Sequence, residues 1–246
     1  MKKRTFTLCL LICLAALAIA GMTLAYFTAE DSADNVFTMK GIRIELREEF
    51  VENSMLIPGL DVNKDVYVAN IGESDAYVRV HIALPTALDA GTPTSDLPCN
   101  FLHWVFPEES VADGQWSYLP SYTDGVGYNG DAQLNRYSTT IDGINYTVYV
   151  ATYRTALTAG TETATQALDK VFIDPCVDCG WDEEKECYYY TDDKGNAVYP
   201  DDYSSNGSVE LKVIAEAAQT HPFANAYDAL NTAFGIPGEY DPWNRP

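Results

Sequence analysis

The sequence predicts an all-β protein: an antiparallel β-sandwich with long loop insertions and one C-terminal helix. Three observations support this prediction: short runs of alternating apolar and polar residues, turn residues between those runs, and one segment with helical periodicity. Successive side chains of a strand point to opposite faces, so alternation indicates a strand with one face in a core. With 246 residues, 47% of them hydrophobic, the chain can bury such a core.

Five segments alternate with period two and are predicted to be strands. The clearest runs from Tyr77 to Leu84, with an aliphatic residue at every second position and tyrosine, arginine, histidine and alanine between them. We expect it to be half-buried, with His81 on the solvent face. Turn signals such as Pro58-Gly59 and Asp142-Gly143 separate the runs. The other four predicted strands cover residues 42–46, 66–69, 144–150 and 209–215.

One helix is predicted over about residues 222–234. Aromatic and aliphatic residues recur there at helical spacing, from Phe223 to Phe234. Pro222 stands near the expected start, and Gly235 marks the expected end. We expect this helix to pack across one end of the sandwich.

Two long segments, about 86–136 and 174–207, are predicted to be loop insertions because they are rich in glycine, aspartate, serine and proline. The first also contains five aromatic residues. These side chains either form a recognition surface or pack beneath the loops, and both alternatives stay open. The five residues are Phe101, Trp104, Phe106, Trp116 and Tyr118.

Residues 1–25 are predicted to be a signal peptide. Three basic residues open the chain, an uncharged run covers residues 8–20, and Thr23 and Ala25 are small residues at the −3 and −1 positions of a cleavage site before Tyr26. A permanent membrane anchor is the alternative, since about 20 apolar residues just span a bilayer. Cleavage leaves an N-terminal segment, 26–41, ahead of a domain that covers 42–246.

Net charge restricts the partners that we expect. The chain carries 36 acidic and 15 basic residues, and removal of the leader leaves 12 basic residues and a net charge of −24. Nucleic acids and anionic lipids would be repelled by such a surface. We therefore expect no nucleic-acid partner, and contact with a membrane only through the precursor's signal segment.

Four cysteines remain after cleavage: Cys99, Cys176, Cys179 and Cys187. Export permits disulfides, and four cysteines allow three pairings. The Cys-x-x-Cys spacing also suits zinc, with Cys99 as a fourth ligand. Disulfides, a zinc site and free thiols all remain open.

Residues for catalysis are not found, so we expect no enzyme. The three histidines, His81, His103 and His221, form no H-E-x-x-H motif, and the sequence contains neither a G-x-S-x-G motif nor a phosphate-binding glycine loop with lysine. The segment after Asp61 begins like a calcium loop but lacks its glycine and its closing glutamate. Loose calcium binding by acidic loops is the remaining cofactor hypothesis beside zinc.

The stretch GMTLAYFTAEDSADNVF, residues 21–37, resembles the leader junction of exported proteins that a SipW-type signal peptidase processes, the TasA/camelysin family. Further similarity lies in VANIG (68–72), in AYVRV (76–80) and in LKVIAEAAQ (211–219). The resemblance implies a jelly-roll-like sandwich that is secreted to the cell surface or biofilm matrix of a Gram-positive-type bacterium. It also implies fibre growth through donated N-terminal strands, with identical or related subunits as partners.

Residues 26–41 are suited to strand donation because they contain no proline and can pair along a sheet edge. Tyr26, Phe27, Val36 and Phe37 are the expected anchors, and burial of each of the last three would contribute about 1.5–3 kcal/mol. The alternative is that this segment folds back onto its own sheet. Two other functions stay open: a surface binding module that uses the aromatic loops, and a camelysin-like metallopeptidase.

Overall fold

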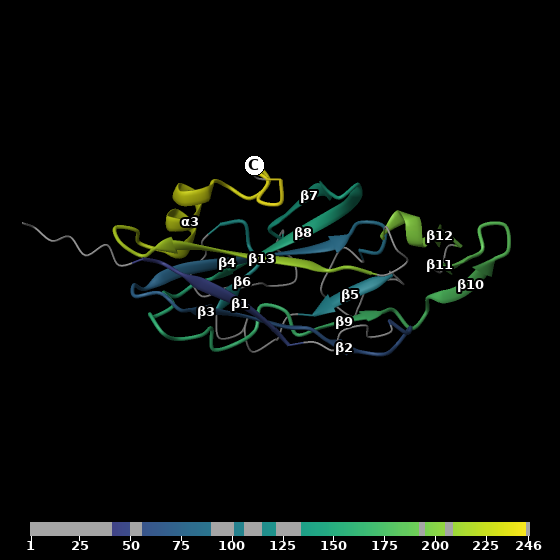
Figure 1. Ribbon diagram of the computed structural model, residues 1–246, viewed down its shortest axis with the longest axis horizontal. Coiled ribbons are helices and arrows are strands. Elements are labelled where there is room, and N and C mark those ends of the chain that lie inside the picture. The colour runs from purple at the N-terminus through teal and green to yellow at the C-terminus, as the bar shows by residue number, and fades with distance from the viewer. Residues whose placement is uncertain are drawn as a thin grey trace, which may run out of the picture. The chain divides into compact units, whose positions relative to one another are not determined.

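The computed structural model describes residues 41–49, 56–89, 101–105, 115–121, 134–191, 195–204 and 209–244. Within these ranges the strands form four antiparallel sheets, accompanied by one α-helix, α3 (Ala226–Phe234), and the 3₁₀ turn η1 (Pro200–Asp202) (Figure 1). The predicted all-β class with a C-terminal helix is therefore confirmed. The finer arrangement, a jelly-roll-like sandwich, stays a prediction.

The largest sheet has the strand order β13-β4-β8-β6, and β7 also pairs with β8. Its middle strand β4 pairs with β13 on one side and β8 on the other, so that Val80 lies between Ala215 and Ala151. The strands are β4 (Ala76–Pro85), β6 (Trp116–Ser117), β7 (Arg136–Ile141), β8 (Ile144–Tyr153) and β13 (Lys212–Gln219).

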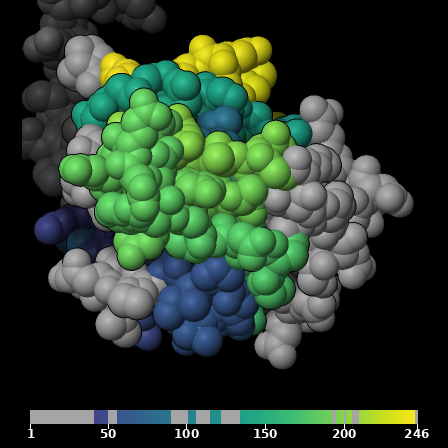
Figure 2. Space-filling view, turned by 90° about the vertical axis from the view of Figure 1, so that its right-hand side faces the viewer, coloured from purple at the N-terminus to yellow at the C-terminus, as the bar shows by residue number. Residues whose placement is uncertain are grey.

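Three smaller sheets complete the described part of the chain: β1-β3, β2-β9-β5 and β10-β11-β12. The last of these lies at the right-hand end of Figure 1, and this end faces the viewer in Figure 2, where its atoms are green. The strands are β1 (Ile44–Glu49), β2 (Val62–Asn63), β3 (Asp65–Asn70), β5 (Leu102–Val105), β9 (Lys170–Ile173), β10 (Asp178–Asp182), β11 (Cys187–Thr191) and β12 (Ala197–Val198).

The segments predicted as loop insertions contain strands. Residues 86–136 supply β5 and β6, and residues 174–207 supply β10, β11 and β12. Trp104, Trp116 and Tyr118 are fully buried, and the ring of Trp104 lies 4.5 Å from that of Tyr149 on β8 between centroids. These aromatic residues therefore belong to the core and form no recognition surface; Phe106 lies outside the described residues.

The main core lies against one face of β4. Val78, Val80 and Ile82 are fully buried there, as the alternation predicts, and pack with side chains from β3, β5, β8 and β9. Ile44 and Leu46 of β1 pack against the same core but stay partly exposed.

The opposite face of β4 is buried too, which makes the prediction of a half-buried strand wrong. Arg79 is 2% exposed and His81 is fully buried, although the sequence placed His81 on a solvent face. The cause is the C-terminal part of the chain: α3 packs its alanine and leucine side chains against Ala218 and Tyr77, and Trp243 packs near Ala83.

Helix α3 begins later than predicted. Asn225 is its N-cap, and the Asn225 side chain accepts a hydrogen bond from the backbone N–H of Asp228. Pro222 and Phe223 belong instead to a turn in which the Phe223 N–H donates to the Thr220 carbonyl. The predicted end is confirmed, since Gly235 caps the helix at φ 101°, a conformation that favours glycine.

The turn between β3 and β4 is hydrogen-bonded to the first residues that the structure describes, Gly41 and Arg43. Ile71 N–H donates to the Arg43 carbonyl, and Glu73 N–H donates to the Gly41 carbonyl. A Cβ atom on Gly72 would lie 2.7 Å from both the Arg43 nitrogen and the Gly41 oxygen. Only glycine lets the two backbones approach this closely, and Asn70 Oδ1 supports the turn by accepting from Gly72 N–H.

Substitution of Gly72 by alanine tests this contact. We expect Gly72→Ala to lower the free energy of unfolding by about 1–3 kcal/mol, because backbone must move to accommodate the methyl group. Gly41→Ala is the matched control, since a Cβ there meets nothing within 4 Å. Urea unfolding of both variants measures the difference, and equal stabilities would contradict the role given to Gly72.

Candidate functional site

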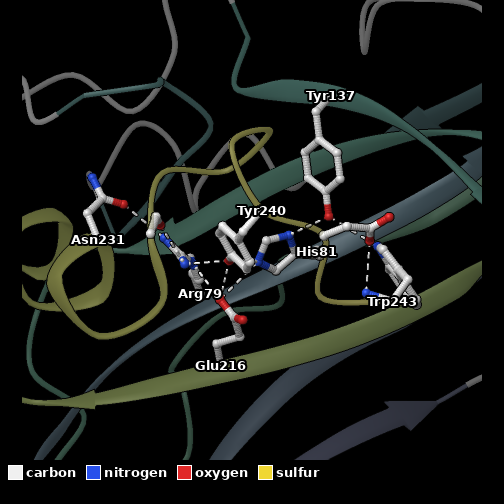
Figure 3. Close-up of polar contacts among 9 residues, drawn as sticks. Arg79, His81, Tyr137, Glu216, Asn231, Tyr240 and Trp243 are labelled. Carbon is white, nitrogen blue, oxygen red and sulfur yellow. Dashed lines mark hydrogen bonds and ion pairs between the residues drawn. The ribbon is translucent and has the colours of Figure 1, made fainter. Parts of the chain in front are cut away.

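A buried polar cluster lies where β4, β13 and the C-terminal segment meet (Figure 3). Glu216 of β13 is its centre. One carboxylate oxygen, Oε2, accepts hydrogen bonds from Arg79 Nε at 2.7 Å and from the Tyr240 hydroxyl at 2.6 Å. We call the cluster the C-terminal clasp; its members are Arg79, His81, Tyr137, Glu216, Asn231, Tyr240 and Trp243.

Arg79 connects the sheet to the C-terminal segment. Its Nη1 donates to Asn231 Oδ1 at 3.0 Å, and its Nη2 donates to the Gly235 carbonyl at 3.2 Å and to the Tyr240 hydroxyl. The guanidinium also lies 5.7 Å from the centroid of the Phe234 ring and 5.4 Å from that of Tyr240. All three guanidinium nitrogens therefore have partners, as a buried cation requires.

His81 extends the clasp to β7. Its Nε2 lies 3.2 Å from Glu216 Oε2, and its Nδ1 lies 3.1 Å from the Tyr137 hydroxyl, which accepts from Trp243 Nε1 at 3.1 Å. A carboxylate can only accept, so Nε2 carries a proton. In the tautomer that carries only this proton, Nδ1 accepts the hydrogen of the Tyr137 hydroxyl.

The clasp fixes the protonation of its own members. Burial by itself would raise the pKa of Glu216, but hydrogen bonds from His81 and Tyr240 and the charge of Arg79 outweigh it and lower that pKa to about 2. Burial raises the pKa of Tyr240, and the hydrogen bond to Glu216 raises it further. Burial likewise raises the pKa of Tyr137. The carboxylate stays ionised and both phenols stay protonated at neutral pH.

The chemistry of the clasp is structural. Glu216 accepts from protein donors, Arg79 donates to protein acceptors, and the Tyr240 hydroxyl does both, so these groups are occupied by one another. A substrate would have to displace these contacts to reach the carboxylate. The arrangement fastens residues 226–243 onto β4 and β13.

Most of the site residues predicted from the leader, from the resemblance and from the cysteines lie outside the described residues. This holds for the cleavage-site residues, the donor-strand anchors and one cysteine. They are Thr23, Ala25, Tyr26, Phe27, Val36, Phe37 and Cys99.

The other cysteines do not converge. Cys176 is disulfide-bonded, while Cys179 and Cys187 are free thiols. Cys179 lies opposite Tyr190 and Cys187 opposite Asp182, so the two thiols are on opposite faces of the β10–β11 hairpin and three positions apart along it. That offset is roughly 10 Å, beyond the reach of a disulfide. The structure therefore does not place Cys179 and Cys187 to share a disulfide or a zinc ion.

Two histidines remain besides His81. His103 is buried, stacks on Phe172 and contacts Asp174 with its Nε2 2.7 Å from Oδ2, whereas His221 is exposed. In the described ranges, no three histidine, cysteine, aspartate or glutamate side chains are grouped so that they can hold a metal ion. The same ranges contain no helix that is long and apolar enough to cross a membrane.

The outer edge of β13 is the second notable feature. All eight residues of β13 pair with β4 on one side, and no described strand pairs with its other side. Val213, Ala215 and Ala217 pack on the main core but are only partly buried. The two charged residues of β13 are Lys212, at its first position, and Glu216, which the clasp buries.

Such an edge can accept another strand. Unpaired N–H and C=O groups along a sheet edge template further pairing, and exposed charges, proline or short strands are the usual protection. β13 has no proline and no exposed charge between Val213 and Ala218. On the neighbouring edge, β1 carries Glu45, Arg47 and Glu49 on its exposed face.

Comparison with known proteins adds no relative: no family model matches the chain, and no curated protein matches it.

The clasp predicts a large cost for removing one member of its ion pair. We expect Glu216→Ala to lower the free energy of unfolding by about 3–5 kcal/mol, because Arg79 is left buried without a countercharge. Glu162→Ala is the control: Glu162 pairs with Arg47 at 2.5 Å, but both side chains are well exposed, so we expect a loss below about 1 kcal/mol. Similar losses in urea unfolding would contradict a buried ionic clasp.

The clasp also predicts a dependence on pH. Because folding lowers the pKa of Glu216 from 4.5 to about 2, its contribution is complete above pH 4.5 and declines as pH falls toward 2. Glu216→Gln lacks this contribution. We expect the stability difference between the native protein and Glu216→Gln to shrink by a few kcal/mol between pH 6 and pH 2.5, as thermal or urea unfolding can measure. A difference that does not change with pH would contradict the lowered pKa.

Proposed function

We propose that this protein is a secreted structural subunit of a bacterial cell surface or extracellular matrix, which assembles through its processed N-terminal strand. In this proposal a SipW-type signal peptidase removes residues 1–25, and residues 26–41 of one subunit pair with the edge of another. The partners are identical or related subunits, and the host is a Gram-positive-type bacterium.

The observation that carries the proposal is that no described strand pairs with the outer edge of β13. This edge offers an eight-residue ladder in which Val213, Ala215 and Ala217 are uncharged and partly exposed. A donated strand would complete the hydrogen bonding of that edge and cover Val213, Ala215 and Ala217. Main-chain pairing supplies affinity in this mode, and alternate side chains supply specificity.

The other two functions have less support. The aromatic residues of the segment 86–136 that the structure describes lie in the core, so the binding module loses its expected surface. A metallopeptidase needs a set of ligands around its metal, and the described residues provide none. The two buried histidines are engaged with carboxylates, His81 with Glu216 and His103 with Asp174.

Strongly negative subunits repel one another, and this sets the conditions for assembly. At a net charge of −24, close packing requires screening, which acts over about 8 Å at physiological ionic strength. Salt, divalent cations or mild acid should therefore favour assembly.

Electron microscopy and light scattering of three forms test the proposal. We expect protein that begins at Tyr26 to form filaments in salt and calcium, while protein that begins at Gly41 stays monomeric because it lacks the donor. Ile214→Lys in the Tyr26 form places a charge on the β13 edge and should slow filament growth at least tenfold. Ser138→Lys on the exposed surface of β7 is the matched control and should have little effect.

Three outcomes would count against the proposal. Persistent monomers of the Tyr26 form would contradict assembly. Filaments of the Gly41 form would contradict strand donation. Equal growth of the Ile214→Lys and Ser138→Lys variants would contradict the choice of β13 as the acceptor.

A further inference from the structure

The β10–β11 hairpin presents the most exposed aromatic side chains of the described residues. Trp181 is 50% exposed and Tyr188 is 64% exposed, whereas every other described aromatic side chain is at least partly buried. The two residues pair across the strands in register and so share one face of the hairpin. Their rings lie 4.8 Å apart between centroids with an interplanar angle of 70°.

This geometry leaves a corner open to solvent. The two rings meet edge to face. Beside that contact, one face of the Trp181 ring and one face of the Tyr188 ring form the two walls of a corner. A flat ligand stacks on a single ring, but a rounded group can contact both walls of a corner. The cation–π attraction favours a cation in this position, because the faces of aromatic rings are electron-rich.

The charge of the hairpin also favours a cation. Residues 178–191 contain five carboxylates and one basic residue, Lys185. Lys185 does not occupy the corner, because its Nζ lies 3.1 Å from the centroid of the Tyr199 ring. Tyr199 packs on Tyr189, which lies on the hairpin face opposite to Trp181 and Tyr188.

Contacts at the base of the hairpin and across its strands restrain it, so we expect the corner to be formed before a ligand binds. Cys176, just before β10, is disulfide-bonded, and Asp174 accepts from the Cys176 N–H while it contacts buried His103. The Tyr189 ring lies across Gly180, where a Cβ atom would come within 2.4 Å of it. Preorganisation of this kind lowers the cost of binding.

We infer that the corner formed by Trp181 and Tyr188 is a binding site for a quaternary ammonium group, of the kind that choline carries. The rounded trimethylammonium head fits between perpendicular rings, its charge suits the acidic hairpin, and it needs no hydrogen-bond acceptor. The side of the molecule that carries this hairpin faces the viewer in Figure 2. The inference does not depend on filament formation, since it uses neither β13 nor the N-terminal segment.

Titration of the purified protein with choline chloride tests the site, followed by tryptophan fluorescence and by NMR of the ligand. We expect saturable binding, and at least fivefold weaker binding of 3,3-dimethylbutan-1-ol, which has the same shape without the charge. Trp181→Leu and Tyr188→Leu keep an apolar side chain but remove an aromatic face, and each should weaken choline binding at least fivefold. Leu60→Ala, at an exposed apolar residue elsewhere, should leave it unchanged.

The same titrations can overturn the inference. An unmodified protein that shows no saturable response to choline has no such site, whatever the variants do. Equal binding of choline and its neutral analogue would identify an apolar patch without cation recognition. Binding of N-acetylglucosamine in place of choline would assign the aromatic pair to sugar stacking.

Discussion

The contact between Arg79 and Glu216 is the constraint on which the rest of the structure depends. It joins β4 to β13, and the remaining donors of Arg79 fasten the end of α3 and the following turn onto the same sheet face. An unpaired charge in this position would be costly, so the sheet and the C-terminal segment can be buried only together. The clasp thus holds the C-terminal segment against β4 and β13, while no described strand is hydrogen-bonded to the far edge of β13.

The two faces of β4 illustrate how differently one sheet can be covered. One face is closed by aliphatic and aromatic side chains of the main core, which need only to exclude water. The other is closed by apolar contacts of α3 and Trp243 together with charged and phenolic groups whose contacts are directional. Directional contacts fix one position of the covering segment, whereas apolar packing tolerates alternatives. The clasp therefore determines the placement of the C-terminal segment as well as its burial.

Alternation in the sequence predicted the long strands well and the clasp not at all. β1, β3, β4, β8 and β13 overlap the five predicted segments, because period-two patterns indicate a strand with one face in a core. Two of them are displaced: β1 and β13 begin two and three residues later than predicted and extend beyond the predicted ends. β7, which is as long as β1 and β3, was not predicted, and neither were the shorter strands β2, β5, β6, β9, β10, β11 and β12. Arg79 and Glu216 are 137 residues apart, and a polar residue on an alternating strand ordinarily indicates solvent. The sequence feature that could have pointed to Arg79 and Glu216 is the predicted helix with the residues after it, because these segments must pack against some surface of the sheet.

Hydrogen–deuterium exchange of β13 measures the central claim most directly. The account predicts that amides within residues 212–219 that face away from β4 exchange readily in the monomer and become protected in the assembled state, while amides of the β10–β11 hairpin keep their rates. Assemblies in which the β13 amides exchange as fast as in the monomer would contradict it, because the subunits would then associate without using that edge.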